Sequence, residues 1–457
     1  MDKIEKHKKN VTEKSLDTTQ GTIWKHLLSL FFPILLGTFF QQLYNTVDAI
    51  IVGQFLGKEA LAAVGGGTAT IISIFVGFFV GIGSGATVVV SQFFGSKNER
   101  AIEYSVHTAI ALSFISGIIV TVVGLVGASF ALKAIKVPAE IFEESLLYMQ
   151  IYVAGVLPLI VYNIASGILR AVGDTKSPLY FLIVGTVLNI ILDIVFIGFF
   201  KWGISGAAWA TIVSQFVSMV LTMRALTHTN ESHKLTLKKI QVHLPILKTI
   251  LKIGFPAGFQ AVLFAISNTL IQANINILGT DSVAAWAAFG KIDSINWMIL
   301  NAYGIAVSTF VGQNYGAKEY NRMLRGTYQG LVLSGFTVIL ISIALYSFAP
   351  VLYTLFVSDE KVITKGVEMI RLISPFFLLF VPVEILTGAM RGAGKPLIPM
   401  IITATGICLI RVLWLSIAVP INQTIETITI CYPITWLITA IMMCIYFFRK
   451  KWLEKYD

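Results

Sequence analysis

The sequence predicts an all-α integral membrane protein in which twelve transmembrane helices form two pseudo-symmetric six-helix lobes. Three observations predict this fold class. Of 457 residues, 56% are hydrophobic and only 13% are charged, so the chain cannot cover a water-facing surface with polar groups. Apolar runs near or above the roughly 20 residues that cross a bilayer core recur along the chain. The second half of the sequence also repeats the first.

The internal repeat becomes visible when the numbering is shifted by about 221 to 223 residues. Pro33 then aligns with Pro256. The segment Gln-Phe-Phe-Gly-Ser-Lys at 92–97 aligns with Gln-Asn-Tyr-Gly-Ala-Lys at 313–318, and the pattern Gly-x-x-Arg-x-x-Gly at 167–173 recurs at 388–394. Matches with so little drift in offset are hard to obtain by chance. The chain is therefore predicted to contain two copies of one structural unit.

The apolar runs place the helices in order and divide the chain. We predict a cytoplasmic tail over 1–26, a first lobe over 27–223, a cytoplasmic inter-lobe linker over 224–248 and a second lobe over 249–457 with a basic cytoplasmic end. Helices of the first lobe are expected at 27–50, 61–90, 105–132, 146–168, 178–200 and 204–223. Those of the second lobe are expected at 249–278, 283–308, 327–352, 368–389, 397–420 and 427–447. The first 25 residues are polar and lysine-rich, so the first spanning helix is expected to act as its own insertion signal.

The formal net charge of +10 is explained by membrane orientation. If both termini are cytoplasmic, 25 of the 34 Lys and Arg residues fall on the cytoplasmic side and six on the opposite side. Such a bias is the positive-inside rule, and it places the basic residues near anionic lipid headgroups. We therefore expect a multi-pass protein of the plasma or bacterial inner membrane that binds no nucleic acid.

No residue pattern indicates an enzyme or a resident metal. Cys408, Cys431 and Cys444 lie in apolar runs, where a free thiol behaves as a small hydrophobe, and no two histidines have ligand spacing. The chain has no phosphate-binding loop and no Ser/His/Asp or Cys/His grouping. Gly77, Gly81 and Gly85, at spacing four, predict a face on which helices approach closely.

Buried polar groups distinguish the first copy from the second. Aspartates at 48 and 193 stand in apolar runs with an asparagine and a threonine nearby, whereas the matching positions of the second copy are Ile271, Ile410, Trp414 and Tyr432. The residues concerned are Asp48, Asn189, Asp193 and Thr211. At about 1.5 Å rise per residue, Asp48, Asp193 and Thr211 fall roughly 12 to 15 Å below the outer face.

An ionised carboxylate at that depth costs roughly 2.5 to 3.5 kcal/mol on the insertion scale, so each acid needs a proton, a cation or a hydrogen-bond donor. One interpretation is that each Asp simply hydrogen-bonds a neighbouring helix. The matched depth in only one copy favours the other, a site for H⁺ or a small cation such as Na⁺ with Asn189 and Thr211 as oxygen ligands.

Several motifs together resemble the multidrug and toxic compound extrusion (MATE) family of antiporters. They are Tyr44-Asn-x-x-Asp48, Asn189-x-x-x-Asp193, Leu169-Arg-Ala-x-Gly173 and Gly206-Ala-Ala-x-Ala-Thr211, set in the twofold repeat. The resemblance covers nearly the whole chain and is to the bacterial branch with its cation site in the N-terminal lobe. It implies that Asp48, Asn189, Asp193 and Thr211 line the coupling-ion site, and that Pro33 permits bending of the first helix.

The chain also departs from the family pattern. Where this branch often carries an Asn one turn before the loop arginine, Ser166 stands here, and Asn163 is the nearest amide. The seventh helix carries no acid. Further candidates for a cavity or a substrate site are Gln41, Asn45, Asn163, Ser166, Gln215, Gln272, Asn276, Lys291, Asp293 and Glu384. Glu384 either binds a proton or substrate or faces Arg391; Lys291 and Asp293 either pair structurally or face a cavity.

The predicted function is secondary active efflux of cationic amphipathic compounds in exchange for H⁺ or Na⁺, by alternating access of two lobes. We expect no cofactor beyond the coupling ion, no metal beyond Na⁺, small organic substrates and a monomer in the lipid bilayer. A flippase of lipid-linked saccharides would require a basic cavity, and only Lys291, Arg371 and Arg411 lie in or beside helices. An integral-membrane transferase would require a cluster of acids or histidines, and a passive channel a polar ring; both alternatives are weaker.

Overall fold

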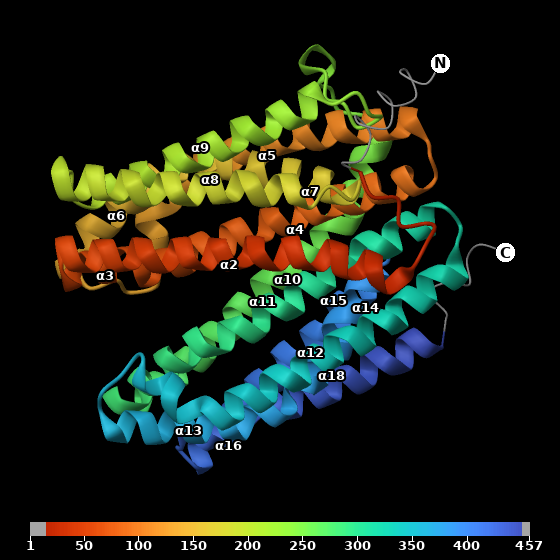
Figure 1. Cartoon of the computed structure of the whole chain (residues 1–457). Helices are drawn as coiled ribbons and strands as arrows, with labels where there is room; N and C mark the ends of the chain where they lie inside the picture. The colour runs from red at the N-terminus through yellow and green to blue at the C-terminus, as the bar shows by residue number, and fades with distance from the viewer. Residues whose placement is uncertain (1–14, 450–457) are drawn as a thin grey trace. The chain divides into compact units, whose positions relative to one another are not determined.

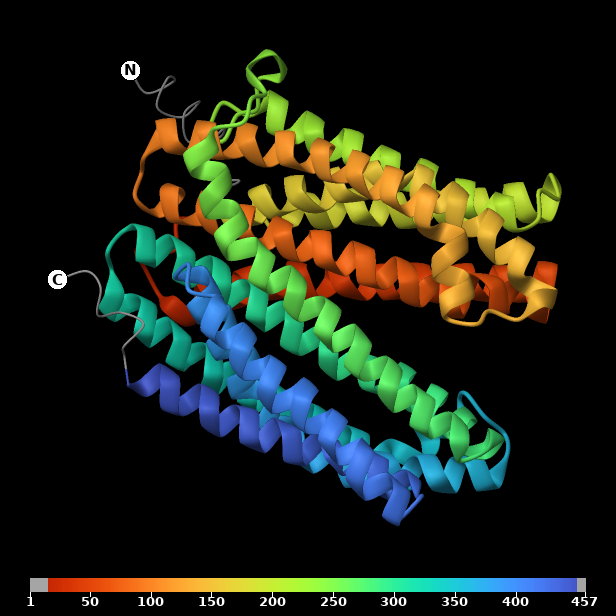
Figure 2. The same ribbon diagram turned by 180° about the vertical axis from the view of Figure 1, so that it is seen from behind.

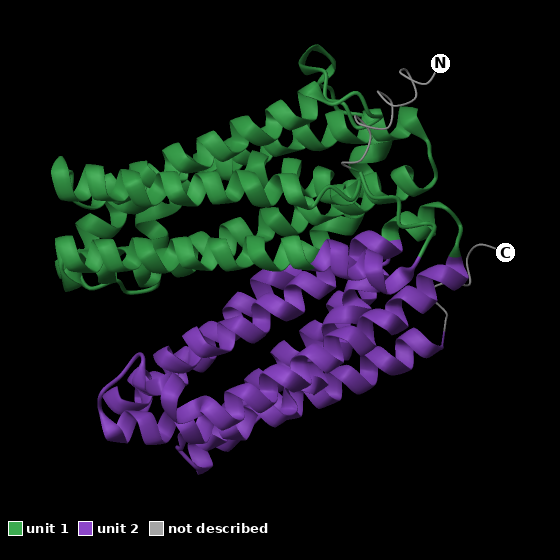
Figure 3. Ribbon diagram, in the orientation of Figure 1, with its two compact units in different colours: residues 1–21, 32–258, 312–319 green, residues 22–31, 259–311, 320–457 purple. Residues whose placement is uncertain are grey.

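The computed structural model describes residues 15–449, and within this range the secondary structure is helical with no strand. Parts of the predicted tail and of the basic C-terminal end, residues 1–14 and 450–457, lie outside the described residues. The chain divides into two compact units, each described by itself (Figure 3). Unit 1 comprises residues 1–21, 32–258 and 312–319; unit 2 comprises residues 22–31, 259–311 and 320–457.

Long helices build unit 1 and run lengthwise beside one another (Figures 1 and 2). They are α2 (Ile23–Leu56), α3 (Lys58–Gly65), α4 (Gly67–Gly95), α5 (Glu99–Ala134), α6 (Ala139–Ala154), α7 (Val156–Ala171), α8 (Lys176–Asp193), the π-helix η1 (Ile194–Phe199) and α9 (Ile204–His228). The first part of α10 (Leu244–Ile277) completes the unit. The short 3₁₀ turn η2 (Leu237–Lys239) lies between α9 and α10.

Unit 2 has the corresponding elements. They are α11 (Thr280–Gly316), α12 (Tyr320–Thr354), α13 (Glu360–Ile373), the 3₁₀ segment η3 (Ser374–Leu379), α14 (Phe380–Gly392), α15 (Leu397–Thr403), the π-helix η4 (Ala404–Leu409), α16 (Ile410–Ile421), α17 (Ile425–Thr429) and α18 (Cys431–Phe448). The last residues of α11 belong to unit 1, and the first turns of α2 belong to unit 2.

Among the described residues, eleven helices or continuous helix runs are long and apolar enough to cross a membrane, and α6 with α7 forms a twelfth span bent by 48°. This confirms the predicted all-α membrane fold. Two predicted helices of the first lobe, however, are interrupted at a glycine. The helix expected at 61–90 is broken beside Gly66, and that expected at 146–168 bends at Gly155.

The two copies repeat each other in backbone conformation as well as in sequence. Lys97 and Lys318, which follow the ends of α4 and α11, both have positive φ, at 54° and 61°. Gly173 and Gly394 repeat the same left-handed conformation after α7 and α14, with φ of 88° and 76°. A left-handed turn after a helix satisfies its last carbonyl groups. The turns that end the long helices are therefore duplicated with the sequence.

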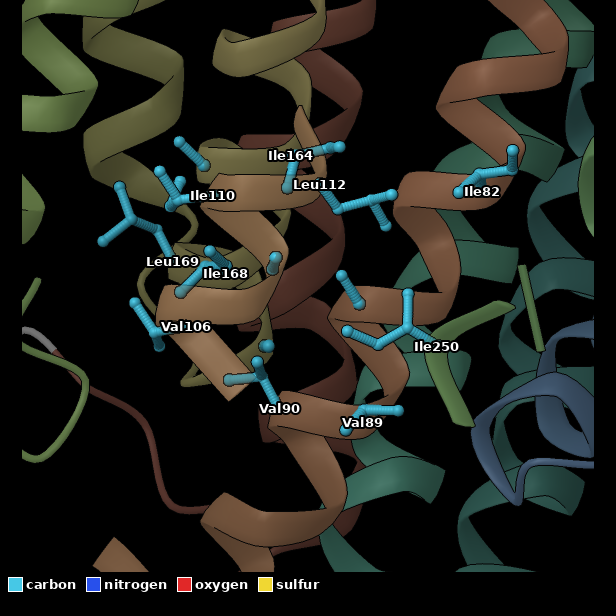
Figure 4. Packing of buried hydrophobic residues seen from close by; sticks show 14 of the residues in the cluster. Ile82, Val89, Val90, Val106, Ile110, Leu112, Ile164, Ile168, Leu169 and Ile250 are labelled. Carbon is cyan, nitrogen blue, oxygen red and sulfur yellow. The ribbon is translucent and has the colours of Figure 1, made fainter. Parts of the chain in front are cut away.

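A hydrophobic core holds α4, α5, α7 and the start of α10 together in unit 1 (Figure 4). Ile82, Val89 and Val90 of α4 belong to this cluster together with Val106 and Ile110 of α5. All five side chains are at most 6% exposed. Because lipid tails are as apolar as these side chains, close packing rather than water exclusion holds such helices together.

Glycines allow α4 and α10 to approach at backbone distance. A β-carbon at Gly81 would collide with the backbone of Gly258, and one at Gly85 would collide with the backbone of Ile250 and Gly254. These collisions account for two of the three glycines in the predicted close-packing face. The absence of a side chain at these positions is what brings the two helices into contact.

The segment between α9 and α10 is shorter than the predicted linker, covering residues 229–243, and it is fixed to unit 1. The Thr236 amide donates to Nε2 of His107 at 3.1 Å, and the His243 amide donates to the Thr108 hydroxyl at 3.1 Å. The rings of Tyr104 and His243 stack with centroids 3.9 Å apart. The linker is thus held along the first turns of α5.

Candidate functional site

Three helices of unit 1 bring the predicted polar groups together. Asp48 comes from α2, Asn189 and Asp193 from α8, and Thr211 from α9. Asn189 and Asp193 lie one turn apart on the same helix and are both fully buried, while Asp48 is 8% and Thr211 5% exposed. The i, i+4 spacing read from the sequence therefore places the amide and the carboxyl on one buried face of α8.

The two acids meet. The carboxyl groups of Asp48 and Asp193 lie within hydrogen-bonding reach of each other. Ionised carboxylates have only acceptor oxygens, so two of them can bond directly only when one carries a proton. A cation between the two carboxylates would likewise offset the repulsion between their negative charges. The matched depth of these residues in the sequence thus corresponds to a direct contact.

Most polar atoms of this group have no protein partner. Asp48 Oδ1, both carboxyl oxygens of Asp193, both amide atoms of Asn189 and Oε1 of Gln215 are buried and make no hydrogen bond to the protein when both acids are ionised. Such atoms are rare inside proteins, because each costs about 1 to 3 kcal/mol. The group of Asp48, Asn189, Asp193 and Gln215 is therefore incomplete without an additional proton, cation or water.

Tyrosines form the adjoining wall of this group. The Tyr44 hydroxyl donates to the Thr211 hydroxyl at 3.0 Å, which joins α2 to α9. On α6, Tyr148 and Tyr152 lie near enough to Asp48 to interact with it electrostatically, and their ring centroids are 6.0 Å apart. Phenol hydroxyls can donate to a carboxylate or accept from a protonated one.

Sequence reasoning missed Tyr148 and Tyr152 as site residues. The signal that could have found them is the repeat comparison itself, because the offset of 221 that aligns 167–173 with 388–394 also aligns them with Met369 and Ile373 in the second copy. The two tyrosines are also spaced i, i+4, so they share a helix face. They are polar groups unique to the first copy, as the acids are.

A π-helix begins directly after Asp193. The segment Ile194–Phe199 continues α8 with one wider turn, and the Phe200 amide donates to the Val195 carbonyl at 2.8 Å. Single π turns inside α-helices are frequently associated with functional sites. In the second copy the π-helix Ala404–Leu409 lies earlier along its helix, so the two copies differ locally near this position.

The other candidates lie apart from this group or make different contacts. Gln41 and Asn45 are exposed on α2, and Lys291 is exposed on α11. Asn163 donates to the Leu159 carbonyl of its own helix at 2.8 Å, and the Gln272 amide donates to Asn276 at 2.8 Å.

Three candidates are largely buried. Ser166 is 1% exposed on α7. Glu384 on α14 lies against Gly304 of α11, because a β-carbon added at Gly304 would collide with the Glu384 carboxyl group. Glu384 also interacts electrostatically with Arg391. Asp293 is 9% exposed on α11 and accepts a hydrogen bond from Trp297.

Pro33 and Pro256 lie inside continuous helices close to the boundaries between the units. Pro33 stands in α2 just after the boundary between residues 31 and 32, and Pro256 stands in α10 just before the boundary between residues 258 and 259. Proline has no backbone N–H, so it removes one hydrogen bond of the helix and allows bending there. In α2 and in α10 the weakest point of the backbone hydrogen bonding therefore lies close to the residue at which the helix passes from one unit to the other.

Comparison with known proteins agrees with the repeat and with the fold. The chain is 28% identical over 404 residues to a probable multidrug resistance protein, YoeA, of Bacillus subtilis, covering 86% of each chain. It is 28% identical over 389 residues to a probable multidrug resistance protein, NorM, of Thermotoga maritima, covering 83% of this chain and 82% of the relative.

Solved structures share the fold at lower sequence identity. An outward-facing multidrug resistance MATE family transporter of the MOP superfamily aligns with a TM-score of 0.89 at 22% identity, covering 96% and 98% of the two chains. A MOP superfamily transporter from Pyrococcus furiosus aligns with a TM-score of 0.90 at 23% identity, covering 97% and 99%. The MatE family model matches residues 33–195 and 256–415, once in each copy. The chain therefore belongs to the MatE family of membrane transporters.

Proposed function

We propose that this chain is a multidrug exporter that expels cationic amphipathic compounds in exchange for H⁺ or Na⁺, bound by Asp48 and Asp193 with Asn189 and Thr211. The observation that carries this proposal is the pair of adjacent carboxyl groups whose buried oxygens lack donors. An added cation or proton supplies what these oxygens lack. The names of the sequence relatives support the drug substrates.

The proposed mechanism is alternating access, in which the two copies change their relative arrangement around a central substrate site. A coupling ion biases that change only if it binds one arrangement more tightly than the other. Asp48 lies on the proline-containing helix α2, whereas Asp193 lies on α8. Bending of α2 would alter the spacing of the two carboxyl groups and hence their affinity for a cation.

The chain is proposed to act as a monomer in the plasma or inner membrane, with both termini in the cytoplasm. The clustering of Lys and Arg in the termini and in alternate loops supports this orientation. Cysteine accessibility to a membrane-impermeant reagent, with single cysteines introduced at exposed Lys97 and Lys201, would test the orientation. Reaction of the Lys97 site from outside intact cells would contradict it.

Ethidium efflux from reconstituted vesicles tests the function, with a proton gradient and a Na⁺ gradient imposed separately. We expect one gradient to drive efflux in the native chain. Asp193→Asn should lose it, while Glu144→Gln, which removes an exposed carboxylate from α6, should keep it. Wild-type efflux in both Asp48→Asn and Asp193→Asn would overturn the coupling assignment. No efflux under either gradient would instead favour the flippase alternative and an assay with a lipid-linked saccharide.

A further inference from the structure

The second copy contains a buried acid of its own. Asp293, on α11, is 9% exposed, and the repeat shift aligns it with the segment Thr70, Ile71 and Ile72 of the first copy, which has no acid. Duplication of the unit therefore does not explain its presence. A carboxylate inside a membrane protein is rare and is retained where it is paired or functional.

The hydrogen bonding of Asp293 is half complete. Its Oδ2 accepts from the indole Nε1 of Trp297 at 2.6 Å, whereas its Oδ1 is buried without a partner. Asn296, one turn further along α11, is 1% exposed, and neither its amide oxygen nor its amide nitrogen has a partner. Three buried polar atoms thus lack partners within one turn of the helix.

Aromatic rings enclose this part of α11. The ring centroids of Trp297 and Trp436 are 6.2 Å apart, and those of Trp436 and Tyr432 are 5.5 Å apart. Trp436 is 1% exposed, and its Nε1 also has no partner. Such surroundings solvate an ionised carboxylate poorly. Because Asp293 has so little accessible surface, a proton can reach its carboxyl group more easily than an organic ligand can.

No cation neutralises Asp293 among the described residues. The titratable groups that face it are Tyr353 of α12 and Tyr432 of α18. The Tyr353 hydroxyl donates to the Ala285 carbonyl at 3.2 Å.

The guanidinium of the buried Arg411 lies 4.4 Å from the ring centroid of Tyr432. Arg411 donates to the Ser267 hydroxyl at 3.2 Å and to the Asn268 oxygen at 3.1 Å, and it makes no ion pair with Asp293 within the described chain. Lys291, on the same helix as Asp293, is exposed.

We propose that Asp293 is a second proton-binding site, located in the second copy, that takes up and releases one coupled proton with Trp297 and Asn296 as its hydrogen-bond partners. This rests on the proposed antiport function. In the ionised state both oxygens accept, and Trp297 supplies one donor. In the protonated state Oδ1–H can donate to the Asn296 amide oxygen on the same helix face. No other bond changes, so the step transfers a single proton.

Infrared difference spectroscopy of the purified full chain between mildly acidic and mildly alkaline pH tests the site without any substrate. We expect a protonated-carboxyl band that persists in the Asp48→Asn/Asp193→Asn double variant and disappears when Asp293→Asn is added to that double variant. Trp297→Phe, which removes the one donor and keeps the acid, should displace the midpoint of this band. A spectrum unchanged by Asp293→Asn means that Asp293 does not titrate, and it overturns the proposal.

Accumulation of ethidium in everted vesicles tests the coupling. Loss of one coupled proton lowers the limiting accumulation ratio tenfold for each pH unit of the imposed gradient. We expect this loss in Asp293→Asn and not in Glu426→Gln, which alters an exposed acid of the same unit. An accumulation ratio equal to wild type overturns the coupling of Asp293. Absence of transport in the native chain would instead overturn the proposed function, since the infrared band does not depend on transport.

Discussion

Replacement of Asp193 by asparagine separates a coupling role from a structural one. Both carboxyl oxygens of Asp193 are buried without a donor, and Asp48 lies within hydrogen-bonding reach. An amide of the same shape brings two N–H donors, one of which can bond the Asp48 carboxylate. A hydrogen bond to a charged group contributes about 1.5 to 3 kcal/mol. Asp193→Asn should therefore raise the free energy of unfolding by this amount and abolish coupled efflux.

Thermal unfolding of the purified chain in detergent measures the stability effect. The entropy of unfolding scales with length at about 2.1 cal/mol/K per residue, so 1 kcal/mol corresponds to roughly 1 °C for a chain of this size. The expected rise in Tm is about 1.5 to 3 °C. Asp359→Ala calibrates the assay, because Asp359 caps α13 through the Lys361 and Val362 amides at 2.9 and 3.3 Å. Loss of this cap should lower stability by about 0.5 to 2 kcal/mol.

The two measurements decide between the roles of Asp193. A coupling role predicts a variant that is at least as stable as wild type and inactive in gradient-driven efflux. A structural role predicts a Tm below that of the wild type, by as much as the loss of the Asp359 cap or more. Wild-type efflux in a stable Asp193→Asn variant would refute the reasoning from unpartnered oxygens.

Three further predictions test the helix packing and the hydrogen bonds of unit 1 outside the site. Gly85→Val should lower the free energy of unfolding by about 1 to 3 kcal/mol, because the valine side chain would collide with the α10 backbone. Gly127→Val is the control, because a β-carbon at Gly127 meets no atom within 4 Å, and it should not lower stability. Thermal unfolding of the two variants measures the difference. Gln313→Leu should loosen the segment at Thr18, whose amide and hydroxyl donate to Gln313 at 2.9 and 2.7 Å, and hydrogen exchange there should rise. Burial lowers the pKa of His233, although nearby acids oppose this effect. Below about pH 6.5 the unfolded linker therefore binds more protons than the folded linker, so the linker should open as pH falls and hydrogen exchange over 229–236 should rise. His233→Gln should remove this pH dependence of hydrogen exchange.

The sequence was sufficient for the architecture because the duplicated features are backbone features. Glycine turns with positive φ, prolines inside helices and glycines at close helix contacts require particular residue types, so their repetition can be recognised in the sequence. Gly173 and Gly394, for example, follow equivalent helices with similar positive φ angles. The break beside Gly66 and the bend at Gly155 were not predicted, because apolar runs continue through both positions and periodicity does not mark where a helix axis turns.

The candidate site was predictable only in part. Asp48 and Asp193 stood out because an acid in an apolar run is costly, and their similar depth anticipated the contact. Tyr148 and Tyr152 did not stand out, because tyrosine is common in membrane helices and carries no comparable cost. The partner of Asp293 was also open in the sequence; the structure identifies it as Trp297, on the next turn of the same helix.

The position of Asp48 on α2 would connect the proposed cation binding to a change of shape. The helix is continuous from Pro33 to Asp48, so a bend at the proline displaces the carboxyl group, while Asp193 is fixed to α8. To move a two-state protein from 1:99 to 99:1, a ligand must prefer one state by about 10⁴-fold, or roughly 5.5 kcal/mol. A pair of adjacent buried carboxyl groups can provide a large preference, because separating them removes the shared proton or cation. By thermodynamic linkage, bending of α2 must change the cation affinity by the same factor by which cation binding changes the equilibrium constant for bending.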